Sequence, residues 1–192
     1  MTARDATAVR MGGIGLLERA INYALGNLRL VTPPDLANPT PCREWDLRAL
    51  LEHLGDSLDA LHEAVEPGRV ELDGPSGSRP DDPVTTVRER ASRLLGAWTN
   101  AEGHDLVSIA GRPLTSGIVT STGAVEVTVH GWDVAAACHA RRPIPATLAR
   151  EILPLAPLVV TEQDRPTRFA APVPSGGGAP GEQLLAFLGR RP

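Results

Sequence analysis

The sequence predicts an all-α protein, a four-helix bundle with a short C-terminal extension. Two observations predict this fold. Apolar side chains recur at helical spacing in four long segments, which are residues 16–30, 47–65, 84–100 and 123–140. Between the first three of them lie stretches rich in Pro, Gly, Ser and Asp, which are typical of surface loops. Four amphipathic helices with short connections predict a bundle whose site lies between helices.

The first two helices have clear ends. The helix over Leu16–Leu30 has to stop before Pro33 and Pro34, and residues 32–43 then form a Pro-rich loop. Asp46 is a suitable N-cap for the second helix, which carries an unbroken stripe of Leu and Val side chains through residue 65. His53 lies at the border of that stripe, so its side chain can turn inward.

The middle of the chain is less regular. Residues 66–83 predict a surface connection without a core of its own, and residues 84–100 form the third helix. We expect residues 103–116 to form a loop, with at most one short helical piece.

The fourth helix is the stretch GAVEVTVHGWDVAAACHA, residues 123–140. The six residues VEVTVH also alternate with period two, so a short strand is an alternative interpretation. The alanine run that follows favours a helix, which Arg141-Arg142-Pro143 then ends, with the two arginines at the negative end of the helix dipole.

The C-terminal third predicts smaller elements. Residues 146–160 form a fifth helix, bent or ended at Pro154. An extended arm over residues 165–181 leads to a short helix at 182–188. We therefore divide the chain into a bundle at 11–160 and a C-terminal arm with a short helix at 161–192.

Composition limits the classes of function. The net charge is −4 and no basic block is present, which argues against nucleic acid as a partner. The two cysteines form no CxxC pair, and no apolar run reaches the roughly 18 residues of a membrane span. We expect a cytoplasmic protein, a monomer or homodimer, with a small-molecule partner and no membrane contact.

Residues for chemistry stand on the fourth helix. Glu126, His130 and Asp133 are spaced by four and three residues, so they form a polar line on an otherwise apolar face. Burying an unpaired polar group costs roughly 2–7 kcal/mol, so these side chains require a partner, a substrate or a metal. A Glu-x-x-x-His step of one helical turn suits two ligands of one ion, and an internal salt bridge is the alternative.

Two motifs resemble a known family. PTPCREWDLRALLEHL (residues 39–54) and VEVTVHGWDVAAA (residues 125–137) resemble the DinB-like bundles of actinobacteria, in the mycothiol-dependent maleylpyruvate isomerase N-terminal-domain group. The C-terminal RFAAPVPSGGGAPGEQLLAFLGRRP also resembles the tail of a metal-binding subfamily of that group. The similarity covers roughly residues 16–190.

The resemblance implies a DinB-like bundle that holds a divalent metal, commonly zinc. By the motif matches, His53, Glu126 and His130 are the ligands, and Asp133 orients a ligand or binds the metal itself, with a salt bridge on the helix surface as the alternative for Asp133. Several relatives use three histidines, which leaves the role of Glu126 open. The maleylpyruvate isomerases also have a substantial second domain, whereas the segment after the bundle is short here, so their substrate pocket is not implied.

The residue types agree with zinc. Two imidazoles and one carboxylate suit a tetrahedral zinc site with one open position, the pattern of a catalytic zinc. Because the resemblance implies a thiol co-substrate, mycothiol, the favoured hypothesis is a metal-dependent enzyme that uses this low-molecular-weight thiol for S-transfer onto an electrophile or thiol-assisted isomerisation. The alternatives are a metal-dependent hydrolase, cyclase or isomerase without thiol, and a non-catalytic metal-binding module.

Other side chains have simpler interpretations. Trp45 and Trp132 suit the core or a pocket wall. Cys42 precedes a helix start that could lower its pKa, although packing explains it equally well, and Cys138 is expected to be buried and inert. Candidates for recognising an anionic thiol or substrate are Arg141, Arg142 and Arg168. The remaining histidines, which are expected on the surface, are His62, His104 and His139.

Overall fold

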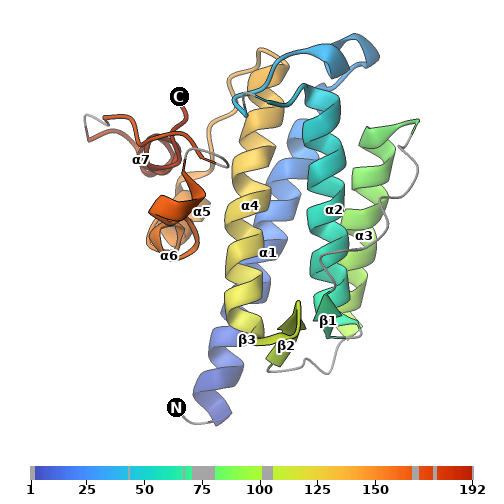
Figure 1. Ribbon diagram of the computed structural model, residues 1–192, viewed down its shortest axis with the longest axis vertical. Coiled ribbons are helices and arrows are strands. Elements are labelled where there is room, and N and C mark those ends of the chain that lie inside the picture. Colours follow the sequence, from blue (N-terminus) through green and yellow to red (C-terminus); the bar gives the residue numbers. More distant parts are fainter. Residues whose placement is uncertain are drawn as a thin grey trace.

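The computed structural model describes residues 3–42, 44–66, 68–70, 81–100, 106–165, 169–174 and 177–191, with the side chains of 3–12, 98–100 and 164 excepted. Four long helices run side by side, as Figure 1 shows. They are α1 (Ala3–Asn27), α2 (Leu47–Val65), α3 (Pro83–Asn100) and α4 (Ser116–Ala137). The predicted helical bundle is confirmed.

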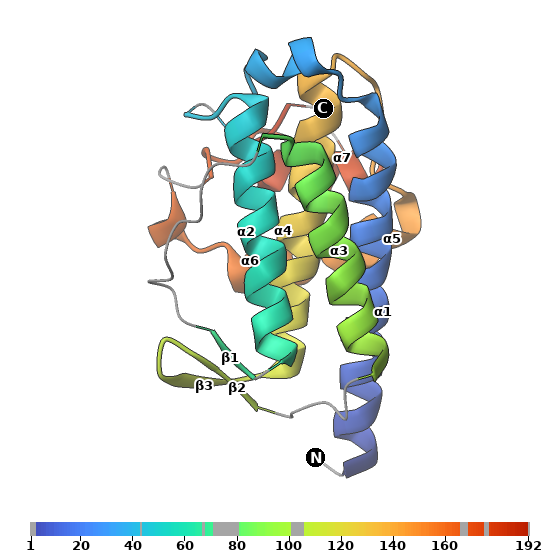
Figure 2. The same ribbon diagram turned by 90° about the vertical axis from the view of Figure 1, so that its right-hand side faces the viewer.

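The bundle is built from two pairs of helices. Helix α1 packs along α4, α2 packs on α3, and α2 also contacts α4 (Figure 2). The core contains mainly Leu, Val and Ala side chains, for example Leu50, Leu54 and Val127, all nearly inaccessible. The strand alternative for residues 125–130 is wrong, because α4 is continuous through them.

The loop between α1 and α2 is more ordered than expected. It contains two 3₁₀ turns, η1 (Leu28–Leu30) and η2 (Pro33–Ala37). Thr32 and Asp35 cap the second of these, since the backbone N–H of Thr32 donates to Asp35 Oδ2 at 2.9 Å. At the start of α2, Asp46 Oδ1 accepts from the backbone N–H of Ala49 at 2.8 Å, which confirms the predicted N-cap.

A small sheet takes the place of the expected loop over residues 106–115, whereas residues 103–105 lie outside the described part of the chain. Strands β2 (Leu106–Ile109) and β3 (Arg112–Thr115) form an antiparallel hairpin, and β1 (Arg69–Val70) pairs parallel to β2. The two-residue turn has positive φ at both positions, 47° at Ala110 and 77° at Gly111. Neither LVSI nor RPLT alternates apolar and polar side chains, so the sequence lacks the period-two pattern that predicts a strand.

Helix α4 ends earlier than predicted. Its last residue is Ala137, ahead of the two arginines, because His139 adopts a positive φ of 55°. The backbone N–H of Ala140 donates to Ala135 O at 2.9 Å, and that of His139 to Ala136 O at 3.0 Å. These two bonds form a Schellman motif, which closes a helix.

The C-terminal segments pack beside α4 (Figure 1). They comprise α5 (Ala146–Ile152), α6 (Ala156–Val159), the 3₁₀ turn η3 (Glu162–Asp164) and α7 (Pro180–Phe187). The predicted break at Pro154 is confirmed, since it separates α5 from α6. Helix α7 packs on α5 and buries Leu184 and Leu185, so this end of the arm is fixed to the bundle.

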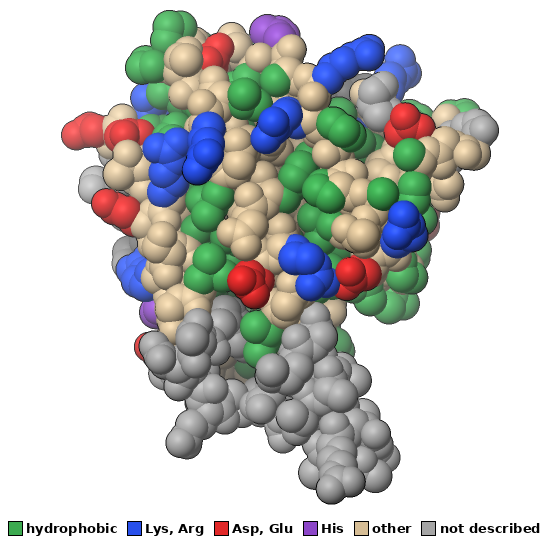
Figure 3. Space-filling model, turned by 180° about the vertical axis from the view of Figure 1, so that it is seen from behind, with side chains coloured by type: hydrophobic (Ala, Val, Ile, Leu, Met, Phe, Trp, Pro, Cys, Tyr) green, Lys and Arg blue, Asp and Glu red, His purple; other side chains and the backbone are tan. Residues whose placement is uncertain are grey.

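Two surface properties bear on partners. None of the described helices is sufficiently long and apolar to cross a membrane. On the face seen in Figure 3, the described arginines are interspersed with acidic and uncharged side chains instead of forming a continuous basic surface.

Candidate metal centre

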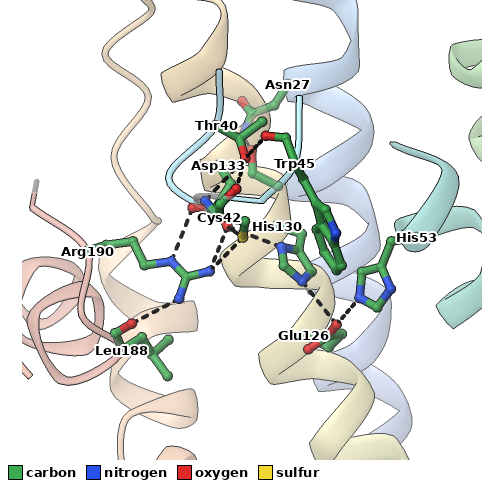
Figure 4. Close-up of polar contacts among 11 residues, drawn as sticks. Asn27, Thr40, Cys42, Trp45, His53, Glu126, His130, Asp133, Leu188 and Arg190 are labelled. Carbon is green, nitrogen blue, oxygen red and sulfur yellow. Dashed lines mark hydrogen bonds and ion pairs between the residues drawn. The ribbon is translucent and has the colours of Figure 1, made fainter. Parts of the chain in front are cut away.

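His53 on α2 and Glu126 and His130 on α4 converge on one point (Figure 4). His53 Nε2 lies 2.7 Å from Glu126 Oε1, and His130 Nε2 lies 3.0 Å from the same oxygen. One ligand atom from each of the three residues lies within 4.8 Å of the other two. The structure therefore brings together the three residues that the sequence analysis selected; that they bind a metal stays a prediction.

Close helix packing makes this convergence possible. Gly123 lies one turn before Glu126, and a Cβ at this position would meet the Leu61 side chain of α2 at 2.6 Å. The absent side chain leaves room for the Leu61 side chain between α2 and α4. His53, at the border of the apolar stripe, then reaches across to Glu126.

The three groups perturb one another electrostatically. Burial by itself would raise the pKa of Glu126, but the two imidazoles, His130 first, outweigh burial and hold this pKa well below its ordinary value. Burial would likewise lower the pKa of His130, whereas Glu126 and Asp133 raise it well above the ordinary value. These contacts stabilise a proton on His130 Nε2. A metal ion that binds to Nε2 would have to displace this proton.

A second acidic residue holds the other nitrogen of His130. Asp133 Oδ2 lies 3.1 Å from His130 Nδ1, and the Asp133 side chain is completely buried. Burial would raise the pKa of Asp133, but its contacts with His130 and Arg190 keep it below the ordinary value. With Nδ1–H donated to this carboxylate, Nε2 is the nitrogen that faces Glu126 and His53.

Cys42, His130 and Asp133 form a second cluster of ligand-type atoms, also within 4.8 Å of one another. This cluster already contains a cation. Arg190 Nη2 lies 3.0 Å from Asp133 Oδ2 and donates to Cys42 Sγ at 3.2 Å. A metal ion at that point would face a buried guanidinium, so the favourable position for an ion is among His53, Glu126 and His130.

The Trp45 ring covers one side of the centre, and the other side is partly exposed to solvent. The Trp45 ring lies 4.5 Å from the His53 ring and 6.1 Å from the His130 ring, centroid to centroid. The side chain of His130 is 6 % exposed, whereas those of Glu126 and His53 are 27 % and 35 % exposed. A small molecule could therefore approach from the side of Glu126 and His53.

The donor set fits a divalent ion. Two imidazole nitrogens and a carboxylate oxygen are ligands that zinc accepts, and three protein ligands leave one position open. Tetrahedral bonds of 2.0–2.1 Å place neighbouring ligand atoms about 3.4 Å apart. The observed 2.7 Å and 3.0 Å contacts need to widen by about 0.7 Å and 0.4 Å, respectively, to reach that spacing.

The other candidates lie elsewhere or have other partners. Arg141 is exposed, Arg142 Nε donates to Asn27 Oδ1 at 3.2 Å, and Arg168 lies outside the described residues. Trp132 packs against the core, as does Cys138, and burial raises the pKa of the Cys138 thiol. His139 is exposed and His62 is half-buried, while His104 lies outside the described residues.

Arg190 and the contact of Cys42 with it were missed by sequence reasoning. Arg190 lies 57 residues beyond Asp133, in a segment expected to be a short helix and its end. No spacing in the sequence relates the two. They come together because α7 packs on α5, which places the residues after α7 beside α4.

Comparison with known proteins decides the family. The family model described as the mycothiol maleylpyruvate isomerase N-terminal domain matches residues 17–135, well over half of the chain. The chain belongs to this family. Membership in this mycothiol-associated, DinB-like group agrees with the resemblance in the two motifs and with the helical bundle. The matched range contains His53, Glu126, His130 and Asp133, whereas Arg190 lies outside it.

The family includes similar proteins in mycobacteria. Two curated relatives from Mycobacterium tuberculosis, "Uncharacterized protein MT0763" and "Uncharacterized protein Rv0738", are each 29% identical over 179 residues. The alignments cover 90% of this chain and 94% of each relative, so they extend beyond the bundle into part of the C-terminal segment. No solved structure matches the chain significantly.

Proposed function

We propose that this protein is a metal-dependent enzyme in which His53, Glu126 and His130 hold a divalent ion, zinc, and a low-molecular-weight thiol is the co-substrate. The thiol is mycothiol, and the reaction is S-transfer to an electrophile or thiol-assisted isomerisation. The observation that carries the proposal is the convergence of the three ligand-type side chains beside an accessible face. The family supports the choice of thiol.

The residues divide the work. Glu126 supplies a negative charge that balances the ion, and its Oε1 already faces both imidazoles. Asp133 fixes the orientation of His130 through Nδ1. Trp45 packs against both rings and excludes water from that side. A divalent ion bound here supplies a Lewis acid that lowers the pKa of a thiol and favours its attack at neutral pH.

The partially exposed face distinguishes this centre from a structural zinc site. Structural sites fill all four positions with protein ligands and are closed. Here the cluster has three ligand-type residues, and two of them, His53 and Glu126, are 35 % and 27 % exposed. This accessibility is the reason to prefer an enzyme over a metal-binding module.

The test compares zinc-loaded protein with and without mycothiol. Thiol consumption is followed with a panel of electrophiles, and isomerisation is followed by the ultraviolet absorbance of maleylpyruvate. We expect turnover that requires both zinc and mycothiol and is lost in His130→Ala. Turnover with zinc but without thiol would instead indicate hydrolysis, cyclisation or isomerisation by the same centre. A metal-loaded protein inactive in every assay would indicate a non-catalytic module.

A further inference from the structure

The C-terminal end of the chain reaches back to the candidate metal centre. Arg190 follows α7, and it is only 4 % exposed. Its guanidinium makes a two-point contact with Asp133, Nε to Oδ1 at 3.3 Å and Nη2 to Oδ2 at 3.0 Å (Figure 4). Its Nη1 also donates to Leu188 O at 2.9 Å, and its Nη2 to Cys42 Sγ at 3.2 Å.

Asp133 connects this arginine to a ligand. The carboxylate that receives the guanidinium also contacts His130 Nδ1 at 3.1 Å. His130 then directs Nε2 at Glu126. An unbroken series of contacts therefore runs from the C-terminal segment through Asp133 to His130, with every member nearly or fully buried.

We propose that Arg190 is a positioning residue of the metal centre, so that docking of the C-terminal segment and metal binding favour each other. The inference rests on the proposed metal site and adds to it a residue outside the family's matched range. Arg190 acts through Asp133, and it is not itself a ligand.

The planar guanidinium explains why the position matters. Its two parallel donors hold both oxygens of Asp133, which fixes the plane of the carboxylate and the direction from which His130 Nδ1 is held. Without Arg190, the buried carboxylate loses two of its contacts and can turn or admit water. The orientation of His130, and with it the preformed ligand set, is then no longer maintained.

A competing effect has to be separated. Removing Arg190 also removes a positive charge near the ion, which by itself would tighten metal binding. Arg190→Lys keeps the charge but loses the two-point contact. Arg190→Gln loses both, so the pair of variants distinguishes positioning from charge.

Arg165 offers a matched control in the same part of the molecule. Its Nη2 donates to Phe187 O at 2.9 Å, its Nη1 to Ala170 O, and its guanidinium lies 5.1 Å from the Phe187 ring. These contacts of Arg165 hold the C-terminal segment in place, and none of them is made with a residue of the candidate metal centre. Arg165→Gln tests whether any loosening of the segment is sufficient.

The first experiment measures zinc affinity by competition with a chromophoric chelator, together with the visible spectrum of the cobalt-loaded protein. We expect Arg190→Gln to weaken affinity about 10- to 100-fold, the usual effect of losing an outer-shell partner, and to shift the cobalt bands. Arg190→Lys loses the two-point contact and keeps the repelling charge, so it should weaken affinity at least as much as Arg190→Gln, whereas Arg165→Gln should match the wild type. Equal affinities and spectra for Arg190→Gln and Arg165→Gln would overturn the inference.

The second experiment uses the unaltered protein, in case Arg190→Gln fails to fold. Coupling is reciprocal, so a metal that prefers the docked segment must also stabilise docking. Docking of the segment raises the zinc affinity by some factor. We expect zinc to slow amide hydrogen exchange over residues 184–190 by that same factor. Unchanged hydrogen exchange in a protein shown to bind zinc would overturn this inference and leave the proposed function intact. A wild type that binds no divalent metal would overturn the proposed function, and this inference with it.

Discussion

Gly131 on α4 and Ala24 on α1 lie so close that a Cβ at position 131 would be 3.0 Å from Ala24 Cα and 3.1 Å from its Cβ. Asn27 on α1 also donates to Gly131 O at 2.8 Å. This contact lies one residue from His130. The approach of α1 to α4 therefore fixes the backbone that presents a ligand-type side chain.

Gly131→Ala should destabilise the protein by about 1–3 kcal/mol, because the added methyl group meets the backbone of α1 and the helices have to separate. The matched control is Gly96→Ala on α3, where a Cβ would meet nothing within 4 Å. There alanine should be neutral or stabilising by roughly 0.5–1 kcal/mol, since glycine is a poor helix former. Urea unfolding of the two variants measures the difference. Equal stability of both would show that the α1–α4 contact is not tight.

His139→Gly should stabilise the protein by about 0.5–1 kcal/mol. His139 has a φ of 55° at the Schellman end of α4, a conformation that glycine adopts without steric cost. The same change within α2, His62→Gly, should have the opposite sign, because it places glycine in a helix. Thermal unfolding of both variants tests this pair. A destabilised His139→Gly would mean that the imidazole makes a contact worth more than the strain.

Tyr23 should make the protein sensitive to alkali. Burial raises its pKa to about 12, and its hydroxyl donates to Arg142 O at 2.8 Å. Folding thus favours the neutral phenol. Its contribution to stability is complete below pH 10, the ordinary pKa, and is lost as the pH rises from 10 to 12. The loss is at most about 2.7 kcal/mol at 1.36 kcal/mol per pKa unit, and less because the ring is partly exposed.

The composition of the chain leaves few other groups that could interfere with this measurement. The chain has one tyrosine and no lysine, so few other groups titrate between pH 10 and 12. Tyr23→Phe loses the hydrogen bond and starts about 0.5–1.5 kcal/mol less stable. Its unfolding free energy should then change little over this range, whereas that of the wild type should fall. Parallel curves would contradict the raised pKa.

Local patterns predicted the features that depend on neighbouring residues. The helical period of apolar side chains gave the four long helices, and Asp46 marked the start of α2. The one-turn spacing of Glu126 and His130 predicted that they lie on the same face of the helix. Asp133, three residues after His130, was predicted to lie on that face as well. His53 required more, since helical spacing placed it only at a border, and the family resemblance related it to the residues on α4.

Features that depend on tertiary packing were not predictable. The strands of the hairpin at Leu106–Thr115 do not alternate apolar and polar side chains, and Ala110 gives no sign of its positive φ. The two glycines that allow close approach, Gly123 and Gly131, only weaken the helix when viewed in the sequence alone. Arg190 is the clearest case, since its contact with Asp133 exists only once α7 has docked.

Metal content tests the central claim most directly. The protein is purified without chelator or affinity tag, and its elements are quantified for the wild type, His130→Ala, Glu126→Gln and the surface control His139→Ala. The account predicts about one zinc ion per chain in the wild type and in His139→Ala, with most of it lost from the other two. Equal traces of metal in all four proteins would contradict it, and would leave Glu126 as the partner of two imidazoles in an internal salt bridge.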